Sequence, residues 1–378
     1  MEAVFFLKPL VDMLYVFQFL DVILMVFCIY CFFTPRFKIT PLKTIDIVAL
    51  VLMLLFLFSF IRNPKGWSQF LKIESSFLLY FLGRFYKMGF PKLLQCLQRG
   101  FIPVLVVTVI AFLAKTGFVY WGQINTFKGV YYFKTDLALA MTQCFIVYGY
   151  HRGHNNKLLR YLILACCLFF ILIANARIYY LIMGLVLFIT ACYYYELKNR
   201  RIIVRLNFKF WLYAAMLLVL TVLIMIWLNG ILGGSLLLVD PTDGLYGEAN
   251  TQGRSIVWAE IYDIFANSNL LSRFMGIDLC SDISPSLGHN SHSLYLKILF
   301  STGYVGCLFF LFFIVLILKT ISSLDNRFYF YITLTFFIMF ILGGVSYITI
   351  ESTQATWIAM FIVGKAVTLN NRKNAQLR

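Results

Sequence analysis

Two histidines lie where a polar segment meets a hydrophobic one, and one of them has the surroundings of a proton acceptor. His289 and His292 fall within Gly288–Gly306, which leads into a long apolar run. Asn290 and Ser291 are residue types that begin helices, so His292 is expected in or beside a first helical turn. The positive end of a helix disfavours a second cation, so His292 should be neutral and able to accept a proton. The alternative is a capping histidine without a chemical role.

Two arginines stand at the edges of apolar segments. Arg177 separates two apolar runs, and Arg254 opens a short segment of helical periodicity. Arginine grips phosphate oxygens with two parallel hydrogen bonds, so this placement favours a lipid-linked phosphate as substrate. The alternatives are a snorkelling side chain for Arg177 and a cation–π contact with Trp258 for Arg254.

Lys134 and Asp136 stand at the start of another apolar run, predicted on the same side as the arginines. They are candidates for substrate contact, and the alternative is a local ion pair. The sequence therefore predicts several cations and a neutral histidine around the opening of one site on the outer face of the protein.

The elements that position these residues must be membrane helices. Of 378 residues, 61% are hydrophobic and only 13% are charged, and the apolar residues come in runs long enough to cross a bilayer. The net charge of +16 is spread over short loops, a pattern of topology control and not of a nucleic-acid-binding face. The nine cysteines indicate neither a disulfide framework nor a metal cluster.

Eleven segments are predicted to span the membrane, within a single integral membrane domain of residues 1–378. Lys72, Glu74, Arg84 and Lys87 interrupt the third, so we expect it to be tilted, packed inside the bundle or partly interfacial. The predicted spans are 12–33, 42–61, 68–90, 101–121, 131–150, 157–174, 177–195, 208–229, 292–318, 326–345 and 354–370.

The basic loops indicate the orientation. They fall on one side of the eleven predicted spans, which should be cytoplasmic. The long segment 230–290, before the ninth span, then lies outside, where it holds seven acidic residues against Arg254 and Arg273. By the same parity the N-terminus is outside. Residues 255–266 carry apolar side chains at helical spacing, which predicts an amphipathic helix on the membrane surface.

Four stretches, in order along residues 120–345, resemble the O-antigen ligase and polymerase superfamily of bacterial envelope polysaccharide enzymes. The most specific places a histidine eleven residues before one glycine, with another glycine three residues later, and this spacing selects His292, with His289 second. The chain departs from the common pattern at Ser293 and Asp136, where asparagine is frequent in the family. The four stretches are Gly129 with Lys134–Ala138, Asn175–Arg177, Gly253–Trp258, and His292 with Gly303 and Gly306.

The resemblance implies a GT-C-like glycosyltransferase that works without a metal or cofactor on undecaprenyl-diphosphate-linked sugars. Its active site would lie on the outer side of the bacterial cytoplasmic membrane, with a chain-length regulator and a flippase as partners. Arg177 and Arg254 would neutralise the leaving diphosphate, and His292 would deprotonate or orient the acceptor hydroxyl. The resulting displacement should be inverting. The further candidate substrate-binding residues are Lys134, Asp136, His289, Trp258 and Arg273.

The favoured function is a polymerase that joins lipid-linked repeat units into O-antigen, capsule or exopolysaccharide. A ligase that transfers the glycan to the lipid A core is the alternative, since both enzymes use the same donor. A transporter or flippase of the same lipids is less favoured, because the spans from residue 101 onward are nearly free of charge at mid-membrane.

Overall fold

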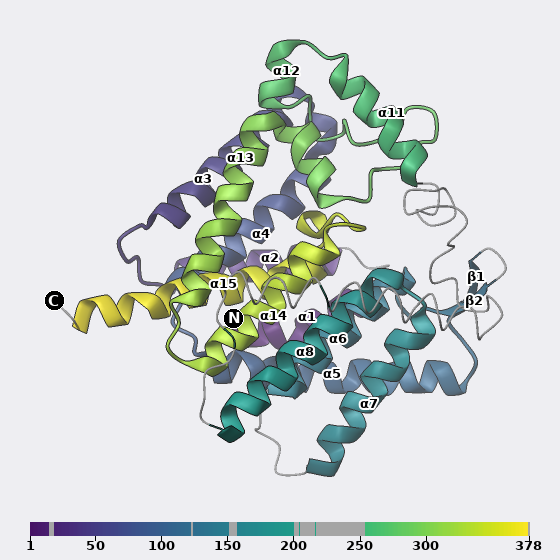
Figure 1. Cartoon of the computed structure of the whole chain (residues 1–378), viewed down its shortest axis with the longest axis vertical. Coiled ribbons are helices and arrows are strands. Elements are labelled where there is room, and N and C mark those ends of the chain that lie inside the picture. The colour runs from purple at the N-terminus through teal and green to yellow at the C-terminus, as the bar shows by residue number, and fades with distance from the viewer. Residues whose placement is uncertain are drawn as a thin grey trace.

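The computed structural model describes residues 1–14, 19–121, 124–150, 157–199 and 254–376, with single positions 204 and 216. The described chain is mostly helical (Figure 1). Among these residues, five helices are long and apolar enough to cross a membrane: α3 (Thr44–Arg62), α5 (Phe90–Leu113), α7 (Lys157–Ala174), α8 (Arg177–Asn199) and α13 (Leu294–Ser322). The shorter helices α2 (Phe19–Phe32), α14 (Arg327–Gly343) and most of α15 (Thr353–Gln376) are also apolar. This is the architecture of an all-α membrane protein. Apart from Met216, the predicted span 208–229 and the loop 230–253 lie outside the described residues.

The charged third segment forms α4 (Trp67–Phe85) and is packed inside the bundle, one of the three outcomes expected for it. Gly83 and Gly364 let α4 and α15 cross closely, because a Cβ on Gly83 would lie 2.1 Å from the Phe361 carbonyl oxygen. Arg84 is buried, with its Nε 3.3 Å from Asp46 of α3. The charge of Arg84 is thus accommodated by a partner on a neighbouring helix.

The prediction of one span over 12–33 is wrong. A first helix, α1 (Glu2–Met13), ends before α2 begins. Lys8 donates hydrogen bonds to both Asp12 and Asp21, the second at 2.8 Å. Residues thirteen apart in one continuous helix would be separated by about 20 Å, so this pairing requires the chain to turn between α1 and α2.

The prediction of a span over 101–121 is also displaced. The helix α5 begins eleven residues earlier, at Phe90, and ends at Leu113. Its polar first half was predicted as a loop, but Leu93, Leu97 and Gly100 are buried, and the backbone of α1 lies against Gly100. Residues 118–121 form β1 (Phe118–Trp121), which pairs antiparallel with β2 (Ile124–Phe127), with Phe118 opposite Phe127. The helix α6 (Lys134–Tyr150) follows.

The ninth predicted span is α13, which begins at Leu294 after the N-cap Ser293. Asn290 and Ser291, predicted to cap it, therefore lie outside the helix, and His292 precedes its N-cap. Gly303 interrupts α13 with φ of 67°, a left-handed conformation in which a Cβ would meet the Phe274 carbonyl oxygen at 2.4 Å. The glycine thus permits both the kink and the close contact.

The amphipathic helix predicted at 255–266 is α11 (Arg254–Ala266). Its buried residues Val257, Ile261 and Phe265 pack against Phe300 of α13. The apolar face expected on the membrane surface is therefore used for packing within the protein. This packing fixes α11 against α13 and so fixes the position of Arg254, the first residue of α11.

Loops from distant parts of the chain meet at the same end of the helices. Arg62, at the end of α3, donates a hydrogen bond to the carbonyl of Gly276, which follows α12 (Leu270–Met275). Leu294 donates from its backbone to the Gly344 carbonyl at 2.8 Å, just before the short helix η3 (Thr349–Glu351). All these loops were predicted to be extracytoplasmic, and this side of the membrane remains a prediction.

Candidate active site

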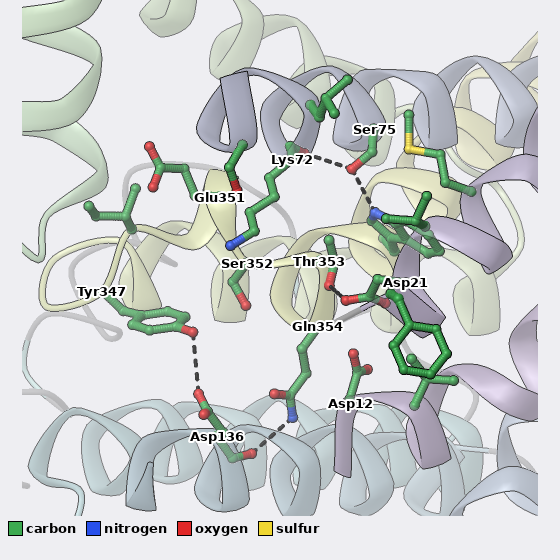
Figure 2. Close-up of a pocket in the computed structure, with 18 of the residues that line it drawn as sticks. Asp12, Asp21, Lys72, Ser75, Asp136, Tyr347, Glu351, Ser352, Thr353 and Gln354 are labelled. Carbon is green, nitrogen blue, oxygen red and sulfur yellow. Dashed lines mark hydrogen bonds between the residues drawn. The ribbon is translucent and has the colours of Figure 1, made fainter. Parts of the chain in front are cut away.

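A cavity of about 720 Å³ lies where α1, α2, α4, α6 and α15 meet the loops before α13 and η3. This volume is within the range of small-molecule binding sites, about 300–1,000 Å³. Polar side chains from separate elements converge on it (Figure 2). Its titratable lining residues are Asp12, Asp21, Lys72, Asp136, His292, Tyr347 and Glu351.

His292 reaches the cavity from a loop that hydrogen bonds hold on both sides. The Ser291 N–H donates to the Asp282 carbonyl (2.8 Å), and the Trp258 indole N–H donates to the Ser291 carbonyl (2.6 Å). The His292 N–H donates to the Asn290 side chain (3.2 Å). His292 has φ of 47°, a conformation that is costly for a non-glycine residue and that clusters at functional sites.

His292 is neutral at pH 7. Burial, followed by the charges of Arg254 and His289, lowers its pKa to about 4, although Asp282 opposes the shift. The neutral state agrees with the prediction, but the cause differs. Desolvation and a neighbouring arginine lower this pKa, whereas the sequence argument had relied on the dipole of a helix that begins two residues further on.

Three cations from separate helices lie within electrostatic range of one another, and one of them, Arg254, acts on His292. We call Lys134, Arg177 and Arg254 the cationic rim. Burial and the charge of Arg177 lower the pKa of Arg254. Lys134, the first residue of α6, lies within electrostatic range of both arginines. None of the three lines the cavity itself, but Arg254 acts electrostatically on His292, which does. An anion at this rim would relieve the mutual repulsion of its charges.

A short turn places Arg177 at the rim. The helix α7 ends at Ala174 and α8 begins at Arg177. Asn175, between them, has φ of 50° and is buried. Asparagine tolerates this left-handed conformation better than most residues do, so the chain can reverse within two residues and present Arg177 at the start of α8.

Asp136 lines the cavity and also organises it. Its carboxylate accepts hydrogen bonds from the Phe133 N–H and the Tyr347 hydroxyl, both at 3.2 Å. Its backbone carbonyl accepts one from Gln354 at 2.9 Å. Asp136 therefore joins the start of α6 to the loop before η3 and to α15.

The other predicted residues lie elsewhere. His289 is exposed, and its carbonyl accepts a hydrogen bond from the Ser284 N–H (2.8 Å). Trp258 supports the His292 loop through its hydrogen bond to Ser291. The predicted cation–π contact between Arg254 and Trp258, both described residues, is not formed. Arg273 donates from Nε to the Ser268 carbonyl (2.9 Å) and does not line the cavity.

Sequence reasoning missed the residues that the N-terminal helices and η3 bring to the cavity: Asp12, Asp21, Lys72 and Glu351. Ionisable residues inside apolar segments were the available signal, because they are rare there unless paired or functional. That signal was used only to question the third span. Asp21 also accepts a hydrogen bond from Thr353 of α15 at 2.8 Å (Figure 2).

Lys297, in the first turns of α13, is buried. Its ammonium lies 2.8 Å from Asp282 and 2.7 Å from Glu351 and also donates to the Leu279 carbonyl. This cluster ties α13 to η3 and to the loop that carries His292. Its role is structural, because its charge is paired within the chain.

No protein-family model matches the chain, and no curated protein matches it. Within the described ranges, no group of three or more His, Cys, Asp or Glu side chains is arranged to hold a metal ion. The functional argument therefore rests on the cavity, His292 and the cationic rim.

Proposed function

We propose that this protein is a membrane glycosyltransferase that polymerises oligosaccharide repeat units carried on undecaprenyl diphosphate. The observation that carries the proposal is the neutral His292 at the wall of a 720 Å³ cavity, beside Arg254 of the cationic rim. The reaction would take place on the outer leaflet of the bacterial cytoplasmic membrane. The motif resemblance around His292, Arg254 and Arg177 supports the same reaction class.

In the proposed reaction, the neutral imidazole of His292 accepts the proton of an acceptor hydroxyl as that oxygen attacks the anomeric carbon of the donor. The bond from this carbon to the diphosphate oxygen breaks, and the electron pair leaves with the lipid diphosphate. Arg254 and Arg177 stabilise the charge that develops there. The attack from the opposite face inverts the anomeric centre.

The low pKa of His292 fits a base that becomes stronger when substrate binds. In the structure, the charge of Arg254 is one cause of that low value. A diphosphate bound at Arg254 would cancel this repulsion and raise the pKa of His292 toward its ordinary value of 6.5. The donor would thus prepare the base for the acceptor.

The test is chain growth in vitro. Purified protein incubated with its own lipid-linked repeat unit should produce a ladder of longer lipid-linked glycans. In cells, the gene should restore long polysaccharide chains to a polymerase-deficient strain. Restored attachment of preformed chains to lipid A would favour the ligase instead. Movement of unextended glycan across liposome membranes would favour a transporter.

A further inference from the structure

Lys72 differs from Lys8 and Lys297, two other lysines near the cavity. The ammonium groups of Lys8 and Lys297 each lie within 2.8 Å of a carboxylate and are buried. Lys72 is half-buried and extends into the cavity (Figure 2). Among the described residues, no carboxylate lies within ion-pairing distance of it, although Glu351 is close enough to feel its charge. A charge placed this way in a membrane protein marks a binding function by default.

The same cavity has an apolar wall whose side chains are exposed at the surface of the protein. Val22, Val26 and Ile29 of α2 line it, and each is more than 40% exposed. Trp67 and Leu71 of α4 line it too and are also exposed. Lys72 lines the same cavity as these apolar side chains, so an ammonium and an exposed apolar groove border one space. This combination suits a charged headgroup with a hydrocarbon tail.

The other charged residues of the cavity restrict where an anion can bind. Asp12, Asp21, Asp136 and Glu351 also line the cavity. In Figure 2, Asp12 and Asp136 lie on the side away from Lys72. Glu351 is close enough to feel the charge of Lys72 but is paired with Lys297. Lys8 is shared between Asp12 and Asp21, and burial raises the pKa of Asp12 to about 7, so this pair offers an anion no attraction. An anionic headgroup is attracted to Lys72, the one Lys or Arg among the described residues that line the cavity.

We propose that Lys72 and the apolar groove of α2 and α4 form a second lipid-phosphate site, separate from the cationic rim. The ammonium binds the phosphate, and the exposed side chains of α2 contact the isoprenoid tail. The assignment rests on the proposed function, because both substrates of a polymerase carry a lipid diphosphate. One diphosphate would occupy Arg254 and Arg177, and the other would occupy Lys72.

The first test measures binding without requiring turnover. Wild-type protein is treated with an amine-acylating reagent, and the labelling of Lys72 is compared by mass spectrometry with that of Lys65, an exposed lysine just before α4. Undecaprenyl diphosphate should slow the labelling of Lys72 about tenfold or more and leave Lys65 unchanged, because a bound phosphate masks the ammonium. Undecaprenol, which lacks the anion, should protect much less.

Two further probes identify the source of the phosphate. Inorganic pyrophosphate should protect Lys72 only at much higher concentration, since it makes no contact with α2. Vesicles of phosphatidylglycerol should protect weakly. Equal protection by phosphatidylglycerol would overturn the assignment to a substrate, and absence of protection by every phosphate would overturn the site. Either result is independent of chain growth, so it can be told apart from failure of the proposed polymerase.

The second test uses variants. Lys72→Met should raise the KM for the lipid-linked repeat unit about 10- to 100-fold, the loss expected for a charged hydrogen bond, and change kcat much less. Lys72→Arg should restore most of the affinity, and Lys65→Met is the matched control. A Lys72→Met protein with unchanged KM and unchanged undecaprenyl diphosphate binding would overturn the proposal. So would a fall in thermal stability that Lys72→Arg restores without restoring KM.

Discussion

Glu351 lies between two lysines whose surroundings are opposite. Lys297 is 1% exposed, and its ammonium contacts both Glu351 and Asp282. Lys72 faces the cavity and has no ion pair among the described residues. A buried charge whose partners belong to the same chain holds elements together, whereas a charge that faces an open cavity is available to a ligand. Arg254 does not line the cavity, but it likewise has no ion pair within the described ranges, and its charge acts on His292, which does line it. Substitution of a charged residue at the cavity should therefore impair activity, and substitution of one that is ion-paired within the chain should impair stability.

The largest effect on activity is expected at His292. His292→Ala should lower kcat for chain growth about 100- to 10,000-fold, because it removes the proposed proton acceptor. Donor binding and detergent stability should change little, since the side chain faces the cavity. Steady-state kinetics and equilibrium donor binding measure the two effects separately. A rate within a few-fold of wild type would remove His292 from the mechanism.

The paired side of the comparison is tested at Lys297. Lys297→Met should lower the free energy of unfolding by about 3–5 kcal/mol, because Asp282 and Glu351 lose the buried charge that neutralises them. Thermal unfolding in detergent measures the change. Lys319→Met, at an exposed position near the end of the same helix, is the matched control. Equal stability of the two variants would show that pairing at Lys297 does not hold the loop.

The rim arginines should affect the transition state more than the fold. Arg254→Ala or Arg177→Ala should lower kcat/KM about 30- to 1,000-fold, or about 2–4 kcal/mol, through lost stabilisation of the diphosphate. Lysine at either position should rescue in part, because it lacks the planar fork that binds two phosphate oxygens. Kinetics and thermal unfolding are measured on the same preparations. Full rescue by lysine would contradict bidentate binding.

A smaller, diagnostic effect is expected in the pH dependence. Because the pKa of His292 is about 4 in the free protein, kcat/KM should be level near neutral pH and fall as the pH drops through about 4, where the imidazole gains a proton. Arg254→Ala removes a repelling charge, so the acidic limb of its pH–rate profile should move upward, toward 6.5. Since the folded pKa lies below the unfolded value, this group should also reduce stability as the pH falls below about 6.5. If the acidic limb of the Arg254→Ala profile does not move, the charge of Arg254 does not lower the pKa of His292.

The smallest effect is expected at His289. Its side chain is exposed and its contact with Ser284 uses the backbone carbonyl, so His289→Ala should keep activity within about twofold of wild type. The same chain-growth assay applies. An inactive His289→Ala together with an active His292→Ala would reverse the choice between the two histidines.

Local composition was sufficient to predict several elements. The helix at 157–174 was predicted with the bounds that the structure has, and α3, α8, α14 and α11 were predicted to within a few residues. Apolar runs of this length and helical periodicity are properties of the nearby sequence alone. The same reasoning predicted a neutral His292 and brought Arg177, Arg254 and Lys134 to one place.

Long-range contacts decided the rest. Lys8 pairs with Asp21 across the break between α1 and α2. The first half of α5 packs against α1, a partner that is distant in sequence. The cavity needs side chains from α1, α2, α4 and η3, whose positions in sequence span from Asp12 to Glu351. Whether a lysine is paired, as Lys297 is, or faces a cavity, as Lys72 does, depends on carboxylates that are distant in sequence. Only the tertiary structure determines those distances, because burial and Coulomb interactions act through space and not along the chain.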